Sequence, residues 1–317
     1  MKTKRFYWPV ILLPFFWFTG VPALSDHSFP SRPLTMLIGY GPGGSTDVQG
    51  RVLVEILSEQ LGQPVDIVYQ PGAGGGVAAA MLAGSADQGY VFQYGSSLAF
   101  TIAPLIAPAS YELNSFRFVA GVTLDQPAIV TGPDKPFETW YELMDYSEDN
   151  PELVYVTPFS QDRFIIRRIA EREGLDLRIL PAAGGSEMAP LVLSGDADIA
   201  TSGGTHSAYT DSGDMIVLVS LADERLVYYP DAPTLRELGY DFSMHAVRVV
   251  VVPAETPDEQ VRVLSEALEA ATRDPRFIEV TEERIRMPVV FKSGEDLNSL
   301  FANQVEEHRQ LIEDSSF

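Results

Sequence analysis

The sequence predicts an α/β protein with two interleaved domains. Short apolar runs alternate with helical patterns, the chain has 317 residues, and no Pro-, Gly- or Ser-rich linker separates two halves. A single hydrophobic core usually stops growing at about 250 to 300 residues, so two are expected here. The missing linker favours a chain that leaves the first domain, builds the second and returns. The predicted bounds are 24–125 plus 246–317 for domain I and 126–245 for domain II, with crossings near Asp125 and His245.

The first strands are predicted at 35–40, 65–69 and 90–94, where short β-type runs occur. Between the first two runs, apolar residues recur at helical spacing until Gly62, which is typical of a helix end. Strand–helix–strand alternation at this pitch predicts a parallel sheet with helices on both faces.

The same alternation continues to the C-terminus. Apolar residues predict a helix over 164–169 and another within 297–312. Before the last of these, Thr256 is predicted as an N-cap and Glu259 as its capping-box partner. Five further β-type runs are predicted as strands: 153–157, 177–180, 198–201, 215–219 and 247–252.

The first 23 residues are typical of a secretory signal peptide. Three bases precede an uncharged stretch over 6–18, and small residues follow at Val21 and Ala23. We therefore expect a signal peptide over 1–23, cleavage near Ala23 and a periplasmic location. An uncleaved N-terminal anchor is the alternative, although the apolar stretch is short for a membrane span.

Composition excludes several classes of function. The chain has no cysteine, so disulfides, thiolate metal ligands and a cysteine nucleophile are excluded. Its formal charge is −22, and cleavage after Ala23 would remove three bases and leave −25. Such a surface repels nucleic acid and anionic lipid, so no nucleic-acid partner is expected. An anion site on this protein has to be built locally from backbone amides or an arginine.

The most informative local feature is the turn over 41–47, directly after the first predicted strand. Its glycines allow close approach to the backbone, and its last residues open a helix whose free N–H groups and positive dipole end favour an anion. The alternative interpretation is a plain tight turn with an aspartate cap. The candidate residues of this turn are Gly43, Gly44, Ser45, Thr46 and Asp47.

A second glycine cluster over 72–76 partly fits a dinucleotide-binding fingerprint. The acidic residue expected after the next strand is missing, because that strand closes with Tyr94 and Gly95. The turn over 41–47 also lacks the Gly-Lys-Ser/Thr ending of a P-loop. No cofactor is therefore expected.

Catalytic patterns are sparse. The four histidines are scattered without metal-ligand spacing, and no serine stands in a Gly-x-Ser-x-Gly motif. Asp47 would fit a general base by position, but the sequence gives it no partner. We expect no catalytic residue and no metal, and binding is favoured over catalysis.

Seven short motifs follow one another along the chain: GPGGSTD at 41–47, LGQPV at 61–65, QPGAGG at 70–75, DQGY at 87–90, GSS at 95–97, PDAPT at 230–234 and PAETP at 253–257. In this order they resemble the receptors of tripartite tricarboxylate transporters, also called Bug proteins. The resemblance covers nearly all of the chain after residue 23 and implies a two-domain periplasmic-binding-protein (Venus flytrap) fold. It also implies a ligand carboxylate held by two turns, one from each domain.

The resemblance assigns the first binding turn to Gly43–Asp47, with strand-end hydroxyls nearby. The second domain departs from the family pattern, because the usual Ser/Gly-rich turn after the strand at 153–157 is replaced by TPFSQDR at 157–163. Arg163 is expected to pair with a second carboxylate or, alternatively, to be a surface residue. The remaining candidate ligand-binding residues are Ser96, Ser97, Thr157, Ser160, Gln161 and Ser202.

The sequence therefore predicts a monomeric periplasmic receptor for a small organic acid, with no cofactor. By resemblance, its partner is a membrane permease with one large and one small subunit. Two alternatives stay open at this point. One is a receptor that feeds a sensor kinase or chemoreceptor, and the other is a secreted enzyme on the same scaffold.

Overall fold

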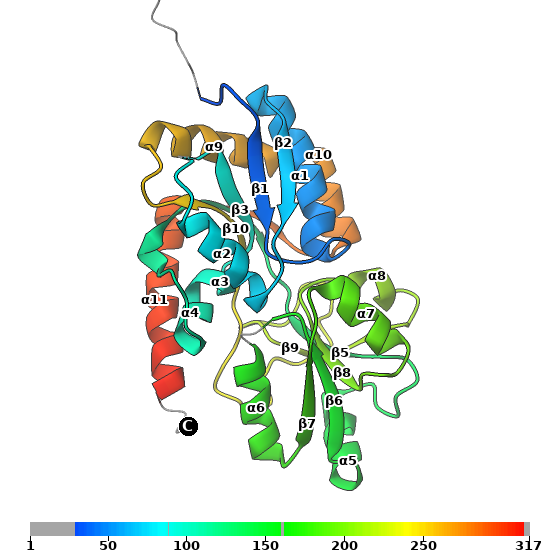
Figure 1. The fold of residues 1–317 in the computed structure, drawn as a ribbon. Helices are drawn as coiled ribbons and strands as arrows, with labels where there is room; N and C mark the ends of the chain where they lie inside the picture. Colours follow the sequence, from blue (N-terminus) through cyan, green and yellow to red (C-terminus); the bar gives the residue numbers. More distant parts are fainter. Residues whose placement is uncertain (1–28, 88, 160–161, 314–317) are drawn as a thin grey trace, which may run out of the picture.

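The computed structural model describes residues 29–87, 89–159 and 162–313. It contains two β-sheets, each flanked by helices, and they lie one above the other (Figure 1). The predicted signal peptide and two candidate site residues, Ser160 and Gln161, lie outside the described residues.

Domain I is the part of the chain built on a six-stranded sheet with the strand order β11-β4-β10-β3-β1-β2. Helices α1 and α9 cover one face of this sheet, and α2, α3 and α11 cover the other. Its strands are β1 (Leu34–Ile38), β2 (Val65–Tyr69), β3 (Val91–Ser96), β4 (Phe116–Leu124), β10 (Val247–Pro253) and β11 (Val289–Ser293). Its helices are α1 (Ser45–Leu61), α2 (Gly76–Ala83), α3 (Leu98–Thr101), α4 (Ala103–Ile106), α9 (Asp258–Ala271), α10 (Pro275–Ile278) and α11 (Gly294–Glu313). Three short segments complete it: the 3-10 turns η1 (Ala73–Gly75) and η2 (Leu113–Ser115) and the π-helical η3 (Glu279–Arg284).

Domain II is built on a five-stranded sheet with the strand order β7-β6-β8-β5-β9. Its strands are β5 (Ala128–Thr131), β6 (Glu152–Thr157), β7 (Asp176–Pro181), β8 (Ile199–Ser202) and β9 (Ile216–Ser220). Its helices are α5 (Trp140–Asp149), α6 (Asp162–Glu173), α7 (Gly185–Leu193) and α8 (Ser207–Thr210).

The chain passes between the two sheets twice. It leaves the first sheet after Leu124 and enters the second at Ala128, and it returns between Ser220 and Val247. Strands that start at these crossings run against their neighbours: β10 is antiparallel to β3 and β4, and β5 is antiparallel to β8 and β9. The predicted strands are confirmed, and the first three, β1, β2 and β3, are parallel as expected. Both sheets are nevertheless mixed, because β5 and β10 are antiparallel to their neighbours. A strand that enters directly from the other domain has no crossover helix to reverse it.

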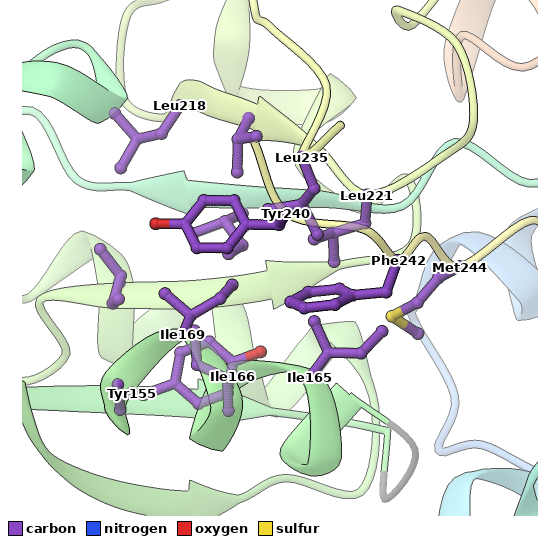
Figure 2. Close-up of a cluster of buried hydrophobic side chains, with 14 of the residues drawn as sticks. Tyr155, Ile165, Ile166, Ile169, Leu218, Leu221, Leu235, Tyr240, Phe242 and Met244 are labelled. Carbon is purple, nitrogen blue, oxygen red and sulfur yellow. The ribbon is translucent and has the colours of Figure 1, made fainter. Parts of the chain in front are cut away.

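Two apolar clusters fill the interior of domain II, one on each face of its sheet. Figure 2 shows the larger one, in which Ile165, Ile166 and Ile169 of α6 pack against the sheet and the returning segment. That segment contributes Tyr240 and Phe242. The periodicity that predicted a helix at 164–169 thus corresponds to the buried face of α6.

The predicted capping box of α9 is wrong. The N-cap is Pro257, with no side-chain cap, and the Thr256 hydroxyl is buried without a hydrogen-bond partner among the described residues. Thr256 and Glu259 have the spacing of a capping box, but the helix starts one residue later than that spacing requires. Pro257 takes the N-cap position, where its ring fixes the backbone.

Candidate functional site

A small cavity lies between the two domains, and its lining includes the β1–α1 turn of domain I and Gly185 at the start of α7. Its volume is about 30 Å³, room for one or two water molecules. Residues of both domains line it: Tyr40, Gly44, Ser45, Thr46, Ser96, Asp125 and Arg248 from the first sheet and its crossing, and Pro158, Phe159, Gly185, Gly203 and Thr205 from the second.

The β1–α1 turn depends on glycine for its shape. Gly43 has φ +87°, a conformation that glycine adopts readily, and Gly44 is the N-cap of α1. A Cβ atom on Gly44 would lie 3.5 Å from the Gly185 nitrogen, so the first residues of α1 and α7 are in contact. The turn therefore brings the positive ends of two helices to one point between the domains.

Asp47 holds this turn together and does not line the cavity. Its carboxylate accepts a hydrogen bond from the Gly43 nitrogen at 2.7 Å and from the Tyr69 hydroxyl at 2.5 Å. It also pairs with Arg51 Nε at 3.0 Å. These contacts occupy both carboxylate oxygens, which agrees with a structural role rather than contact with an anion.

Several hydrogen-bond donors around the cavity are unused. Within the described residues, no group accepts from the Thr46 or Asp47 nitrogen, as expected for the first turn of a helix. Ser96 ends β3, is 5% exposed, and its hydroxyl has no partner among the described residues. The Ser45 nitrogen makes a long contact of 3.4 Å to Thr205 Oγ1.

Arg248 lies at the floor of the cavity and is only 2% exposed. Its Nε donates to Asp125 Oδ1 at 2.8 Å, and Nη1 donates to the Ser45 carbonyl at 3.1 Å and to Gln49 Oε1 at 2.8 Å. Its Nη2 donates to Ser45 Oγ at 2.7 Å and to the Gly203 carbonyl at 2.9 Å. All five donors of the guanidinium are therefore satisfied, one of them by the other domain.

Electrostatics keep this arginine charged. Burial alone lowers the pKa of Arg248, but the nearby Asp125 carboxylate and Tyr94 raise it above its ordinary value. The positive charge is balanced by Asp125 directly at the crossing between the sheets. The network is thus a buried ion pair with its hydrogen-bonding capacity fully used.

An aromatic pair closes one side of the cavity. The rings of Tyr40 and Phe159 are 5.7 Å apart in an edge-to-face arrangement, and the Tyr40 hydroxyl donates to the Gly74 carbonyl at 3.1 Å. Burial, followed by the charge of Asp125, raises the pKa of Tyr40 above its ordinary range, so the hydroxyl stays protonated. A Cβ on Gly203 would lie 2.7 Å from the Phe159 ring, which shows how closely that ring fits.

The other predicted residues divide into two groups. Ser97 accepts from the Val247 nitrogen at 3.2 Å, and Ser202 contacts the nitrogen and ring of His206 at 3.1 and 3.0 Å. Both are buried and neither lines the cavity. Thr157 and Arg163 line a separate cavity, also between the domains.

Sequence reasoning missed Arg248, Asp125, Tyr40 and Thr205. The sequence does contain a signal for Arg248, because this residue interrupts an otherwise apolar β-branched run. A charge in a buried strand needs a partner. Nothing in the sequence indicated that Asp125 would be that partner.

Nothing in the described part of the chain groups three or more histidine or acidic side chains as metal ligands. In the same part, no helix combines the length and apolar character needed to cross a bilayer. Burial lowers the pKa of His206 to about 3, so its ring is neutral and serves to pack against Tyr229, 5.0 Å between ring centres. The cavity itself offers hydrogen-bond donors around a buried positive charge.

Two α/β domains, joined by two crossings around such a cavity, define a solute receptor of the periplasmic binding class. The chain belongs to the tripartite tricarboxylate transporter family receptors, whose sequence profile matches residues 50–317. It is 28% identical to the protein BugT of Bordetella pertussis over 281 residues, 86% of each chain.

Solved structures have the same fold. The periplasmic binding protein BugD superposes with a TM-score of 0.81 at 24% identity, covering 90% of this chain and 98% of BugD. MatC from Rhodopseudomonas palustris, solved with bound malate, gives a TM-score of 0.80 at 22% identity, covering 90% of this chain and all of MatC. The predicted family and fold are confirmed.

Proposed function

We propose that this protein captures a small organic acid between its two domains in the periplasm and delivers it to a membrane permease. The observation that carries the proposal is the set of unused donors at one point, the Thr46 nitrogen and the Ser96 hydroxyl, beside the positive end of α1. Charge-assisted hydrogen bonds to a carboxylate are the strongest use of such donors.

The surrounding charges also favour an anion. Asp125, the acidic residue of the cavity lining, is neutralised by its contact with Arg248. A second helix, α7, presents its positive end from the opposite domain. The bound malate of MatC supports a carboxylate as the ligand class.

Ligand entry requires the domains to separate. The Gly41 nitrogen donates to the Ala183 carbonyl at 3.0 Å, and Ser45 Oγ donates to the Gly203 carbonyl at 2.9 Å, so the two domains are in direct contact. A cavity of about 30 Å³ is far smaller than the 300 to 1,000 Å³ typical of small-molecule sites. We infer that the domains turn about the crossings, and that a bound acid shifts the population between open and closed forms.

The proposal is tested by calorimetry and thermal unfolding of residues 24–317 with a panel of mono-, di- and hydroxycarboxylates. Each acid is matched by its amide as an uncharged control. At a concentration 100 times the dissociation constant, a binding acid stabilises the protein by about 2.7 kcal/mol. If every acid and its amide give the same melting temperature, the proposed ligand class is wrong.

Variants test the site itself. Ser96→Ala should weaken binding of the best acid by about tenfold, because a hydrogen bond to a charged group is lost. Thr46→Ala removes the hydroxyl of a residue that lines the cavity but keeps its backbone nitrogen, so a smaller loss of affinity is expected. Ser194→Ala, an exposed serine in domain II, is the matched control and should leave affinity unchanged. If Ser96→Ala and Thr46→Ala bind the acid as tightly as Ser194→Ala, the side chains of Ser96 and Thr46 are not part of the site. Mass spectrometry of the released ligand distinguishes a receptor, which returns the acid intact, from an enzyme.

A further inference from the structure

A second cavity lies between the domains, beside the first. Its volume is about 310 Å³, within the range that small organic ligands fill. Pro158 lines both cavities, and Tyr40 of the first donates to the Gly74 carbonyl in the wall of the second. The second cavity is lined by Gly72, Ala73 and Gly74 of domain I and by Thr157, Pro158, Arg163, Pro181, Ala182 and Ala183 of domain II.

Arg163 carries the charge of this cavity. It is the second residue of α6, and its Nε is buried without a hydrogen-bond partner among the described residues. A guanidinium is always charged, and a buried donor left without an acceptor costs about 1 to 3 kcal/mol. Arg163 also lines the cavity, so an acceptor group there meets its guanidinium.

The neighbouring carboxylate does not supply the acceptor. Asp162 Oδ1 and Oδ2 accept from Thr157 Oγ1 at 2.7 and 2.6 Å, and Oδ2 also accepts from the Tyr155 hydroxyl at 2.7 Å. The side chain is fully enclosed by these contacts, on the interior side of α6. Asp162 therefore stabilises the β6–α6 turn and makes no hydrogen bond to Arg163.

The rest of the lining is neutral. In a chain with 44 acidic residues, no Asp or Glu is among the described residues that line this cavity. On the side of domain I, Gly72 and Gly74 have φ of +130° and +61°, and they present backbone without side chains. An acidic group that enters the cavity therefore meets one guanidinium and no opposing carboxylate.

We propose that Arg163 forms a second anion subsite, which binds a carboxylate group between α6 and the turn at 72–74. The guanidinium donates two parallel hydrogen bonds, which the two oxygens of a planar carboxylate accept. The group belongs either to the far end of a dicarboxylate whose first carboxylate occupies the β1–α1 turn, or to a separate small acid. The first source rests on the proposed function, and the second does not.

Calorimetry with matched acids distinguishes the two sources. Adipate and hexanoate share a chain length and differ by one carboxylate, and each is titrated into residues 24–317 of the wild type, Arg163→Met and Arg167→Met. Arg167 is an exposed arginine one turn further along α6, so it controls for the loss of charge. If one dicarboxylate reaches both sites, Arg163→Met should bind adipate at least tenfold more weakly than the wild type. Hexanoate affinity should then change less than twofold, and Arg167→Met should match the wild type.

A direct readout covers the case in which no acid binds at the β1–α1 turn. The Nε–H resonance of Arg163, assigned by its loss in Arg163→Met, is followed by NMR during titration with acetate. A saturable shift with acetate, together with unchanged adipate preference in Arg163→Met, assigns the subsite to a separate small acid. If neither acetate nor adipate moves this resonance, and Arg163→Met binds adipate like the wild type, the subsite does not exist. That result would leave the proposed function intact wherever hexanoate still binds.

Discussion

Two arginines lie at the boundary between the domains, and they differ in how their donors are used. Arg248 has five acceptors, all from the protein, while Arg163 has a buried Nε with none among the described residues. Arg248 comes from a central strand, where its buried charge is paired with Asp125, and Arg163 comes from a helix start beside a cavity. The difference separates an arginine whose donors are all used by the protein from one that we propose binds a ligand.

The largest expected effect is on Arg248. Arg248→Met should lower the free energy of unfolding by about 3 to 5 kcal/mol, because Asp125 is left buried without its partner. Urea unfolding followed by circular dichroism measures this loss. Arg163→Met is the matched comparison and should change stability by less than about 1 kcal/mol, since no native hydrogen bond of Nε is broken. Similar losses of unfolding free energy in both variants would contradict the view that Arg248 stabilises the fold and Arg163 does not.

The carboxylate beside Arg163 gives the next prediction. Burial raises the pKa of Asp162 to about 6, although hydrogen bonds from Thr157 and Tyr155 and the charge of Arg163 lower it. Because the folded state holds this proton more tightly, the resulting stability is complete below about pH 4 and is lost as the pH rises through 6. At about 1.4 kcal/mol for each pH unit between the folded and unfolded pKa, the change is about 3 kcal/mol.

Asp162→Asn removes this dependence, so the difference in unfolding free energy between wild type and variant should shrink by that amount from pH 4 to pH 7. Groups that titrate equally in both proteins cancel in the difference. In the Arg163→Met background the transition should move to higher pH, because a positive charge that lowers the pKa is gone. A pH-independent difference would show that Asp162 is not protonated in the folded state.

The smallest expected effect concerns Ser96 and Ser97, two adjacent serines of which one has a hydrogen-bond partner in the protein and the other has none among the described residues. Ser97→Ala should cost about 1 to 2 kcal/mol, because the buried Val247 nitrogen loses its acceptor. Ser96→Ala should be within about 0.5 kcal/mol of the wild type, because the Ser96 hydroxyl has no partner to lose. Thermal unfolding without added acid gives both values, and the reverse order would contradict the assignment of Ser96 to the ligand.

The fold was predictable because its signals are local. Buried runs such as 247–252 and the apolar stripe of α6 report directly on strands and helices. The direction of β5 and β10 was not predictable in this way, because it follows from where the chain crosses between sheets. The predicted domain bounds remain a prediction, although the crossings at 125–127 and 221–246 are compatible with them.

The site was predictable only in part. The β1–α1 turn carries its own glycines and hydroxyls, so its position was visible in the sequence. Asp47 was assigned to the ligand because it stands in that turn, but its carboxylate is used by Gly43, Arg51 and Tyr69. The partnership of Arg248 with Asp125 spans 123 residues, and no local pattern reports a contact of that kind.

Asp125 stands in the three-residue crossing from β4 to β5, so the carboxylate that balances Arg248 is part of the hinge itself. Turning one sheet relative to the other twists the backbone that carries this carboxylate, while the arginine is fixed in the central strand β10. Under the proposed turning of the domains about the crossings, this ion pair lies where the chain passes between the sheets, so it has to persist or break as the domains separate.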